Sequence, residues 1–116
     1  MRVKVLSEKK EVLGVDVEIA STMFSRMKGL MFENEMKGYD GLLIKPCNQI
    51  HTFFMKYNID VVFLDKSNKV VKVIENLKPW RLTPLYFSAS KVLELKANTI
   101  GARIQKGETL EVVCIS

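Results

Sequence analysis

The segment Asp60–Asp65, DVVFLD, places four consecutive apolar residues between two aspartates. A run this short that is apolar at odd and even positions alike is typical of a strand buried on both faces. The polar stretch Asp65–Lys69 follows, and then the apolar segment Lys69–Glu75, which predicts a hairpin with Asn68 as the residue best suited to a positive φ. The chain is therefore expected to fold around a central strand that is covered on both sides.

Further short segments are typical of strands, either because apolar and polar residues alternate with a period of two, as in Arg2–Leu6 and Val15–Ile19, or because a short apolar run is ended by proline, as in Gly41–Lys45. We expect strands at Arg2–Leu6, Val15–Ile19, Gly41–Lys45, Thr52–Met55, Ala89–Leu95 and Thr109–Ile115. A short helix is expected from Ser21 to Gly29, one or two helical turns at Asn98–Arg103, and an irregular crossing over the core at Leu77–Leu85, which contains two prolines. The predicted fold class is mainly β (β-rich α+β), an antiparallel jelly-roll-like sandwich or distorted barrel with one or two short helices.

Composition narrows the class of protein. A chain of 116 residues with 47% hydrophobic and 27% charged residues fits one globular domain, residues 1–116. The first residues contain no apolar signal segment, and no stretch approaches a membrane span, so we expect a cytoplasmic protein that makes no membrane contact. The net charge of +5 leaves a polyanion-docking module open. Nucleic acid is not the expected partner, because no run of adjacent basic residues with interleaved aromatic residues occurs.

His51 is the only histidine, and it lies four residues after Cys47. An imidazole can act as an acid, a base or a ligand near neutral pH, or it can simply bond to a backbone carbonyl or to Asp60. A Cys–His pair oriented by Asp60 would suit a small hydrolase or transferase. Two candidate ligands are too few for a zinc site, so we expect no metal.

Other polar and aromatic residues are candidates for the same site. Asp60 precedes the buried strand and has to find a partner if it is removed from water, such as His51, Arg26 or Arg81. Trp80 and Arg81 combine an indole ring with a forked donor, which suits sugars, anions or a peptide edge. Paired-carboxylate chemistry would require Asp60 to lie near Glu94.

Several blocks in a fixed order carry a family resemblance: HTFFM, NIDVVFLD, NLKPWR and KVLELKA, with Arg26 three positions before Gly29-Leu30-Met31 upstream. This order resembles a family of small bacterial and archaeal domains known as domain of unknown function 192. The resemblance implies a compact β-rich, jelly-roll-like fold and no established activity. It also implies that Phe54 and Asn98 stand where relatives often have glycine, and Asn58 where proline is common.

The leading hypothesis is a non-enzymatic binding or accessory domain. Its polar cleft is expected to be built from Arg26, His51, Thr52, Asp60, Trp80 and Arg81, and to bind a small polar or anionic ligand or a partner segment. A small hydrolase or transferase that uses His51 with Cys47 or Asp60 is the alternative from another class, and the polyanion-docking module is the third. The chain has no Walker loop, GxGxxG, GxSxG, HExxH or CxxC motif, which disfavours nucleotide-dependent chemistry, and no cofactor is expected.

Overall fold

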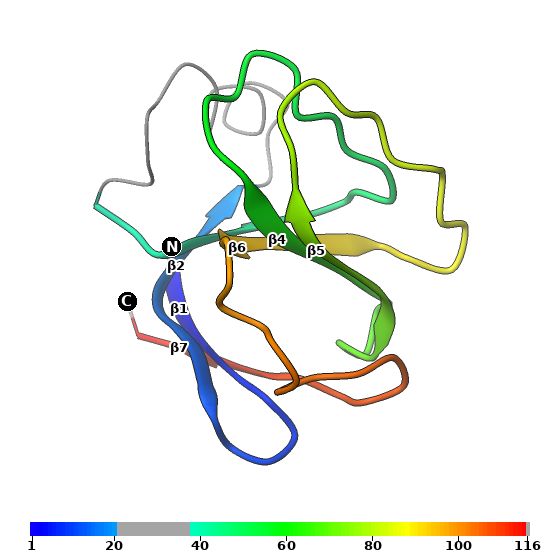
Figure 1. The fold of residues 1–116 in the computed structure, drawn as a ribbon. Coiled ribbons are helices and arrows are strands. Elements are labelled where there is room, and N and C mark those ends of the chain that lie inside the picture. Colours follow the sequence, from blue (N-terminus) through cyan, green and yellow to red (C-terminus); the bar gives the residue numbers. More distant parts are fainter. Residues whose placement is uncertain (21–37, 116) are drawn as a thin grey trace.

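The computed structural model describes residues 1–20 and 38–115, and in these residues the secondary structure is entirely β (Figure 1). The chain forms the strands β1 (Arg2–Leu6), β2 (Val12–Ala20), β3 (Gly41–Ile44), β4 (Ile59–Leu64), β5 (Val70–Leu77), β6 (Lys91–Lys96) and β7 (Glu111–Cys114). They make one sheet in the order β5-β4-β6-β3-β2-β1-β7. The predicted mainly β fold class is thus confirmed, while the helix expected at 21–29 lies outside the described residues.

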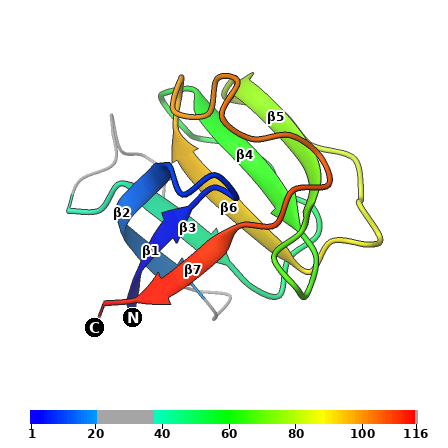
Figure 2. The same ribbon diagram turned by 90° about the horizontal axis from the view of Figure 1, so that it is seen from below.

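The sheet is mixed and open. Strands β2 and β3 pair in parallel, and the other neighbours pair antiparallel, which corrects the expectation of a purely antiparallel fold. The sheet curls until its two edges come close at one end, where an isolated bridge links Lys69 to Thr109 (Figure 2). Beyond that bridge, β5 and β7 are not paired with each other in the described part of the chain, so the curled sheet does not close into a barrel.

Two hydrophobic clusters cover the two faces of the sheet. The concave cluster fills the inside of the curl, and the segment that follows β6 contributes Ile100, Ile104 and Leu110 to it. The convex cluster lies on the outside and is completed by the loops before β4 and before β6, which contribute Cys47, Ile50, Met55 and Ala89. Figure 1 shows these loops on one side of the sheet and the orange segment after β6 on the other.

Strand β4 explains why the sheet can be covered on both sides. All six of its residues are buried: Val62 and Leu64 point into the concave cluster, and Val61 and Phe63 into the convex cluster. The prediction of a fully buried strand is confirmed, but β4 is not central, because it lies second from the edge of the sheet, beside β5. Asn68, in the hairpin that follows, has a φ of 66°, as its place in the turn predicts.

Two predicted elements are absent. Thr52–Met55 forms a turn, closed by a hydrogen bond from Met55 N to Thr52 O (3.2 Å), and is not a strand. Asn98–Arg103 forms turns and not a helix, with Asn98 at a φ of 66°. In both places the backbone is set by contacts with distant segments, which a local pattern does not reveal.

Gly41 lets β3 pack closely among its neighbours. A Cβ at this position would come within 2.9 Å of Leu95 Cδ2 and 3.1 Å of both the Glu94 carbonyl oxygen and Val17 Cγ2. These contacts come from β2 and β6, the two strands that flank β3. Because one of the atoms belongs to the backbone, a side chain here would push β6 away from β3.

Candidate functional site

Thr52 fastens the segment after β5 to the loop before β4. Its side chain is fully buried, and its hydroxyl donates to Lys78 O (2.6 Å) and accepts from Arg81 N (2.9 Å). Its backbone adds bonds from Thr52 N to Arg81 O (2.8 Å) and from Trp80 N to Thr52 O (3.0 Å). Thr52 therefore holds the candidate residues Trp80 and Arg81 beside His51, although its own side chain is closed to solvent.

Four rings gather at this junction, and we call His51, Phe53, Phe54 and Trp80 the aromatic surface. The ring of His51 stacks on Phe53 at 4.8 Å, and Phe53 stacks on Trp80 at 5.9 Å. Phe54 meets Trp80 edge-on at 4.8 Å. His51 Nδ1 accepts a hydrogen bond from Phe53 N (3.3 Å), which leaves Nε2 as the donor of the neutral ring. Phe53 and Phe54 were not among the predicted site residues, although two aromatic residues so close to the only histidine were a visible signal.

Two residues of the aromatic surface have a left-handed backbone conformation. Phe54 has a φ of 68° and is 46% exposed, and Trp80 has a φ of 62° and is 57% exposed. This conformation costs a residue other than glycine about 1–2 kcal/mol. Phe54 and Asn98 both have a positive φ in this chain. Glycine adopts this conformation without strain, which explains why the family resemblance implies that relatives often have glycine at both positions.

Every charged side chain in the two segments that carry the aromatic surface is basic. Residues 45–59 and 78–93, the two segments that meet there, contain Lys45, Lys56, Lys78, Arg81 and Lys91 and no aspartate or glutamate. Arg81 is exposed, and its Nη1 lies 3.4 Å from Pro79 O and 3.5 Å from Trp80 O, both in its own loop. Burial and then the nearby charge of Lys45 lower the pKa of Lys91, while Asp65 acts in the opposite sense. Lys91 itself bonds to the turn between β4 and β5, whereas Lys56, Lys78 and Arg81 are the exposed cations nearest in sequence to the rings.

Asp60 does not lie with the other residues of the predicted polar cleft. It is fully buried, and its carboxylate accepts hydrogen bonds from Asn76 N (2.9 Å) and Ile100 N (3.0 Å). Along β4 it shares a face with Val62 and Leu64, which belong to the concave cluster, whereas the loop that carries His51 packs on the convex cluster. The structure thus brings His51, Thr52, Trp80 and Arg81 together without Asp60, and Arg26 lies outside the described residues.

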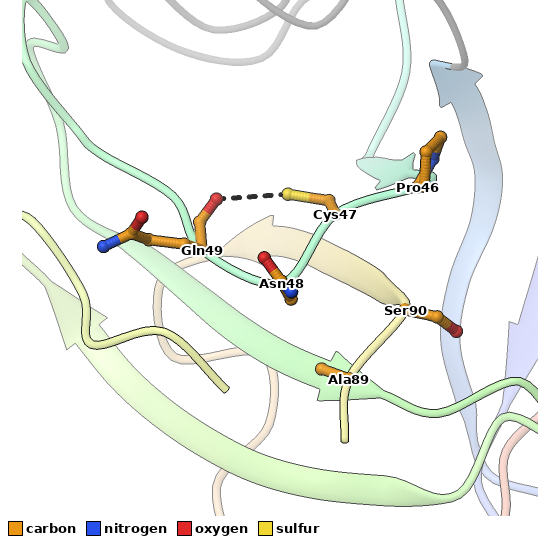
Figure 3. Close-up of a pocket in the computed structure, with 6 residues that line it drawn as sticks. All are labelled: Pro46, Cys47, Asn48, Gln49, Ala89 and Ser90. Atoms are coloured by element: carbon orange, nitrogen blue, oxygen red, sulfur yellow. Dashed lines mark hydrogen bonds between the residues drawn. The ribbon is translucent and has the colours of Figure 1, made fainter. Parts of the chain in front are cut away.

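Cys47 is not paired with His51 in this structure. The thiol is buried and donates to Gln49 O (3.2 Å), the bond drawn in Figure 3. It lines an open hollow of about 450 Å³ together with Pro46, Asn48, Gln49, Ala89 and Ser90. Because the thiol and the imidazole each bond to their own loop backbone, the arrangement lacks the nucleophile–base contact that covalent catalysis requires.

Glu94 is a buried acid on the other face of the sheet from Asp60. It pairs with Val61 across β4 and with Leu42 across β3, so its side chain points toward the convex cluster. Paired-carboxylate chemistry with Asp60 is therefore not supported by the geometry. Burial raises the pKa of Glu94 to about 8. In the described part of the chain, acidic, histidine and cysteine side chains nowhere gather in threes that could hold a metal ion.

Comparisons with known proteins agree with this architecture. The chain matches the family model DUF192, described as "Uncharacterized ACR, COG1430", over residues 4–112. It is 36% identical to a UPF0127 protein of Thermococcus sibiricus, over 72% of this chain and 56% of the relative. It is 31% identical to a UPF0127 protein of Pyrococcus furiosus, over 89% of this chain and 91% of the relative. The chain thus spans little more than half the length of the first of these relatives and most of the second.

A crystal structure from Novosphingobium aromaticivorans, of a protein of unknown function, has the same fold. It superposes with a TM-score of 0.78 at 22% identity and covers 96% of this chain and 84% of that protein. A protein from Sinorhizobium meliloti superposes equally well, with a TM-score of 0.78 at 22% identity, and covers 96% and 92% of the two chains. None of the described residues forms a helix long and apolar enough to span a membrane. With its sequence matched almost end to end and its sheet shared with solved structures, the chain belongs to the uncharacterised family DUF192.

Proposed function

We propose that this chain is a non-enzymatic binding domain that takes up an anionic ligand or partner segment on the aromatic surface. The observation that carries the proposal is the pair of exposed rings, Phe54 and Trp80, on left-handed backbone. A left-handed φ is costly for a bulky residue, and a ring more than 40% exposed recovers only part of the free energy that full burial would give. Stability alone is therefore a poor reason for these residues, and exposed aromatic side chains are typical of binding surfaces.

The charge around the rings supports an anionic ligand. Lys56, Lys78 and Arg81 are exposed on the two segments that carry the aromatic surface, and neither segment has an acidic residue to neutralise them. His51 adds an N–H donor at Nε2, because its Nδ1 already accepts a bond from Phe53 N. A planar or carboxylate-bearing group can then contact the rings and the cations at once.

The only tryptophan of the chain is Trp80, so its fluorescence reports directly on this surface. We would titrate the chain with four probes: inorganic pyrophosphate, a sulfated oligosaccharide, an oligothymidylate and an acidic peptide without tryptophan. At least one should shift the emission of Trp80, and Arg81→Gln should weaken that probe while the chain keeps its melting temperature.

Lys106→Gln is the matched control, because it removes one positive charge from an exposed residue far from the aromatic surface. Its neighbour Gly107 bonds to Val70 at the start of β5, whereas Arg81 follows the end of β5. This variant should bind as the native chain does. An emission spectrum that no probe changes would contradict the proposal, and so would equal weakening by the two substitutions.

The enzyme alternative has less support, because Cys47, His51 and Asp60 each bond to separate backbone groups. The polyanion-docking alternative is tested directly by the oligothymidylate and sulfated probes.

Both cysteines are free, which fits the proposed reducing compartment, the cytoplasm.

A further inference from the structure

The aromatic surface continues into an exposed apolar strip. The segment from Trp80 to Tyr86 runs antiparallel beside residues 48–52 and is fastened by Thr83 N to Ile50 O (3.0 Å) and Tyr86 N to Asn48 O (3.0 Å). Its anchored side chain, Thr83, is buried, and hydrogen bonds join its hydroxyl to the backbone of Ile50. The large apolar side chains exposed in this segment and directly after it are Leu82 (62% exposed), Leu85 (42%) and Phe87 (86%), which together we call the apolar strip. Backbone bonds therefore hold Trp80–Tyr86 to the surface at regular points, and Phe87 follows directly after the last of them.

From this surface we infer that the partner is a polypeptide segment that combines large apolar side chains with aspartate or glutamate. The inference rests on the proposed function and names the class of its ligand. Exposed leucine and phenylalanine side chains match apolar side chains of another protein, and they offer nothing to hydrogen-bond with a sugar or a base. Trp80 and Arg81 belong to the residue types enriched in interface hot spots, and phenylalanine is enriched in protein interfaces generally.

The stacking of the rings argues against nucleic acid as the occupant. Phe53 lies between His51 and Trp80, with both ring pairs inclined by 26°, and Phe54 approaches Trp80 edge-on. The rings thus contact one another, whereas single-strand binding requires ring faces open for successive bases. A compact ring cluster instead suits the apolar side chains of a peptide.

Charge argues against a second copy of the chain as the occupant. A symmetric contact through this surface would place Lys56, Lys78 and Arg81 against the same three cations, and like charges brought together are repelled. Acidic residues flanking the apolar contacts would instead complement them. The same argument predicts that binding weakens as salt is added.

The test is selection from a random peptide display library on the native chain, with counter-selection on a Phe87→Ser, Arg81→Gln double variant. The selected sequences should combine aliphatic or aromatic residues with Asp and Glu. A synthetic selected peptide without tryptophan should shift Trp80 emission. Its affinity should fall about tenfold for each single substitution and stay unchanged for Lys106→Gln. Exchange of its Asp and Glu for Asn and Gln should also weaken it.

The outcomes separate the two proposals. If the oligothymidylate or the sulfated oligosaccharide shifts Trp80 emission and the selected peptides do not, the binding function stands and a polypeptide partner is ruled out. If neither peptides nor other probes affect Trp80, both fall. A neutral or basic consensus would overturn the acidic partner. Sedimentation that shows a dimer in the native chain and a monomer in Phe87→Ser would assign the strip to a second copy instead.

Discussion

Asp60 and Glu94 are buried carboxyl groups on neighbouring strands, and they meet opposite environments. Asp60 faces the concave side, where two backbone amides bond to its two oxygens. Glu94 faces the convex side, where burial raises its pKa to about 8 and no hydrogen bond to it is found in the described residues. The concave side of the sheet therefore accommodates a charge, whereas the convex side favours the neutral acid.

The largest expected effect is that of Asp60→Ala. It removes two charge-assisted bonds and leaves the amides of Asn76 and Ile100 without their acceptor, so the free energy of unfolding should fall by about 4 kcal/mol. Urea denaturation followed by circular dichroism measures this loss. Asp16→Ala is the control, because Asp16 pairs with Arg2 at the surface (2.9 Å) and should cost less than about 1 kcal/mol. Equal losses in the two variants would show that Asp60 is no structural anchor.

Glu94 should make the stability of the chain depend on pH. Its pKa is about 8 in the folded chain against 4.5 ordinarily, so the folded state holds the proton more tightly. Stability from this group is complete below pH ~4.5 and is lost as the pH rises through about 8, at up to ~1.4 kcal/mol per pH unit.

Glu94→Gln should remove that slope and add up to about 3 kcal/mol at pH 7. Denaturation midpoints between pH 5 and pH 9 measure the change. Glu75→Gln is the control, since Glu75 is exposed on β5 and should leave the slope as it is. A native chain whose stability is flat across this range would contradict the neutral acid and remove the contrast with Asp60.

The sequence predicts the positions of the strands better than it predicts how they pair. The alternation in β1 and the doubly apolar run in β4 located both strands within a residue or two, because burial of apolar side chains dominates there. The parallel pairing of β2 with β3 was not predictable in the same way, since pairing direction depends on how the intervening chain crosses and not on either strand's pattern.

The candidate site was predictable only in part. His51, Trp80 and Arg81 were identified from their chemistry, and the structure does bring them together through Thr52. Asp60 was expected to pair with His51, Arg26 or Arg81, but its carboxylate instead accepts hydrogen bonds from two backbone amides. Its two partners lie 16 and 40 residues away along the chain, where no local pattern records them.

The next prediction concerns the hydrogen bonds by which Thr52 fastens the segment after β5 to the convex side of the sheet. Thr52→Val keeps the shape and removes the hydroxyl between Lys78 O and Arg81 N, so the free energy of unfolding should fall by about 2 kcal/mol. Trp80 emission should also move toward that of a solvent-exposed indole. Thr99→Val is the control, because its hydroxyl bonds to Lys96 O at the exposed turn after β6, and the change should cost less. Unchanged emission in Thr52→Val would mean that other contacts position Trp80.

The smallest expected effect isolates the backbone strain on the convex side. Phe54→Ala and Phe54→Gly both remove the ring that contacts Trp80, but only glycine relaxes a φ of 68°. The glycine variant should therefore be about 1 kcal/mol more stable than the alanine variant. In an unstrained loop the order reverses, because glycine gains more freedom on unfolding. If alanine proves the more stable, position 54 carries no strain, and the argument that its ring is retained for binding loses its energetic basis.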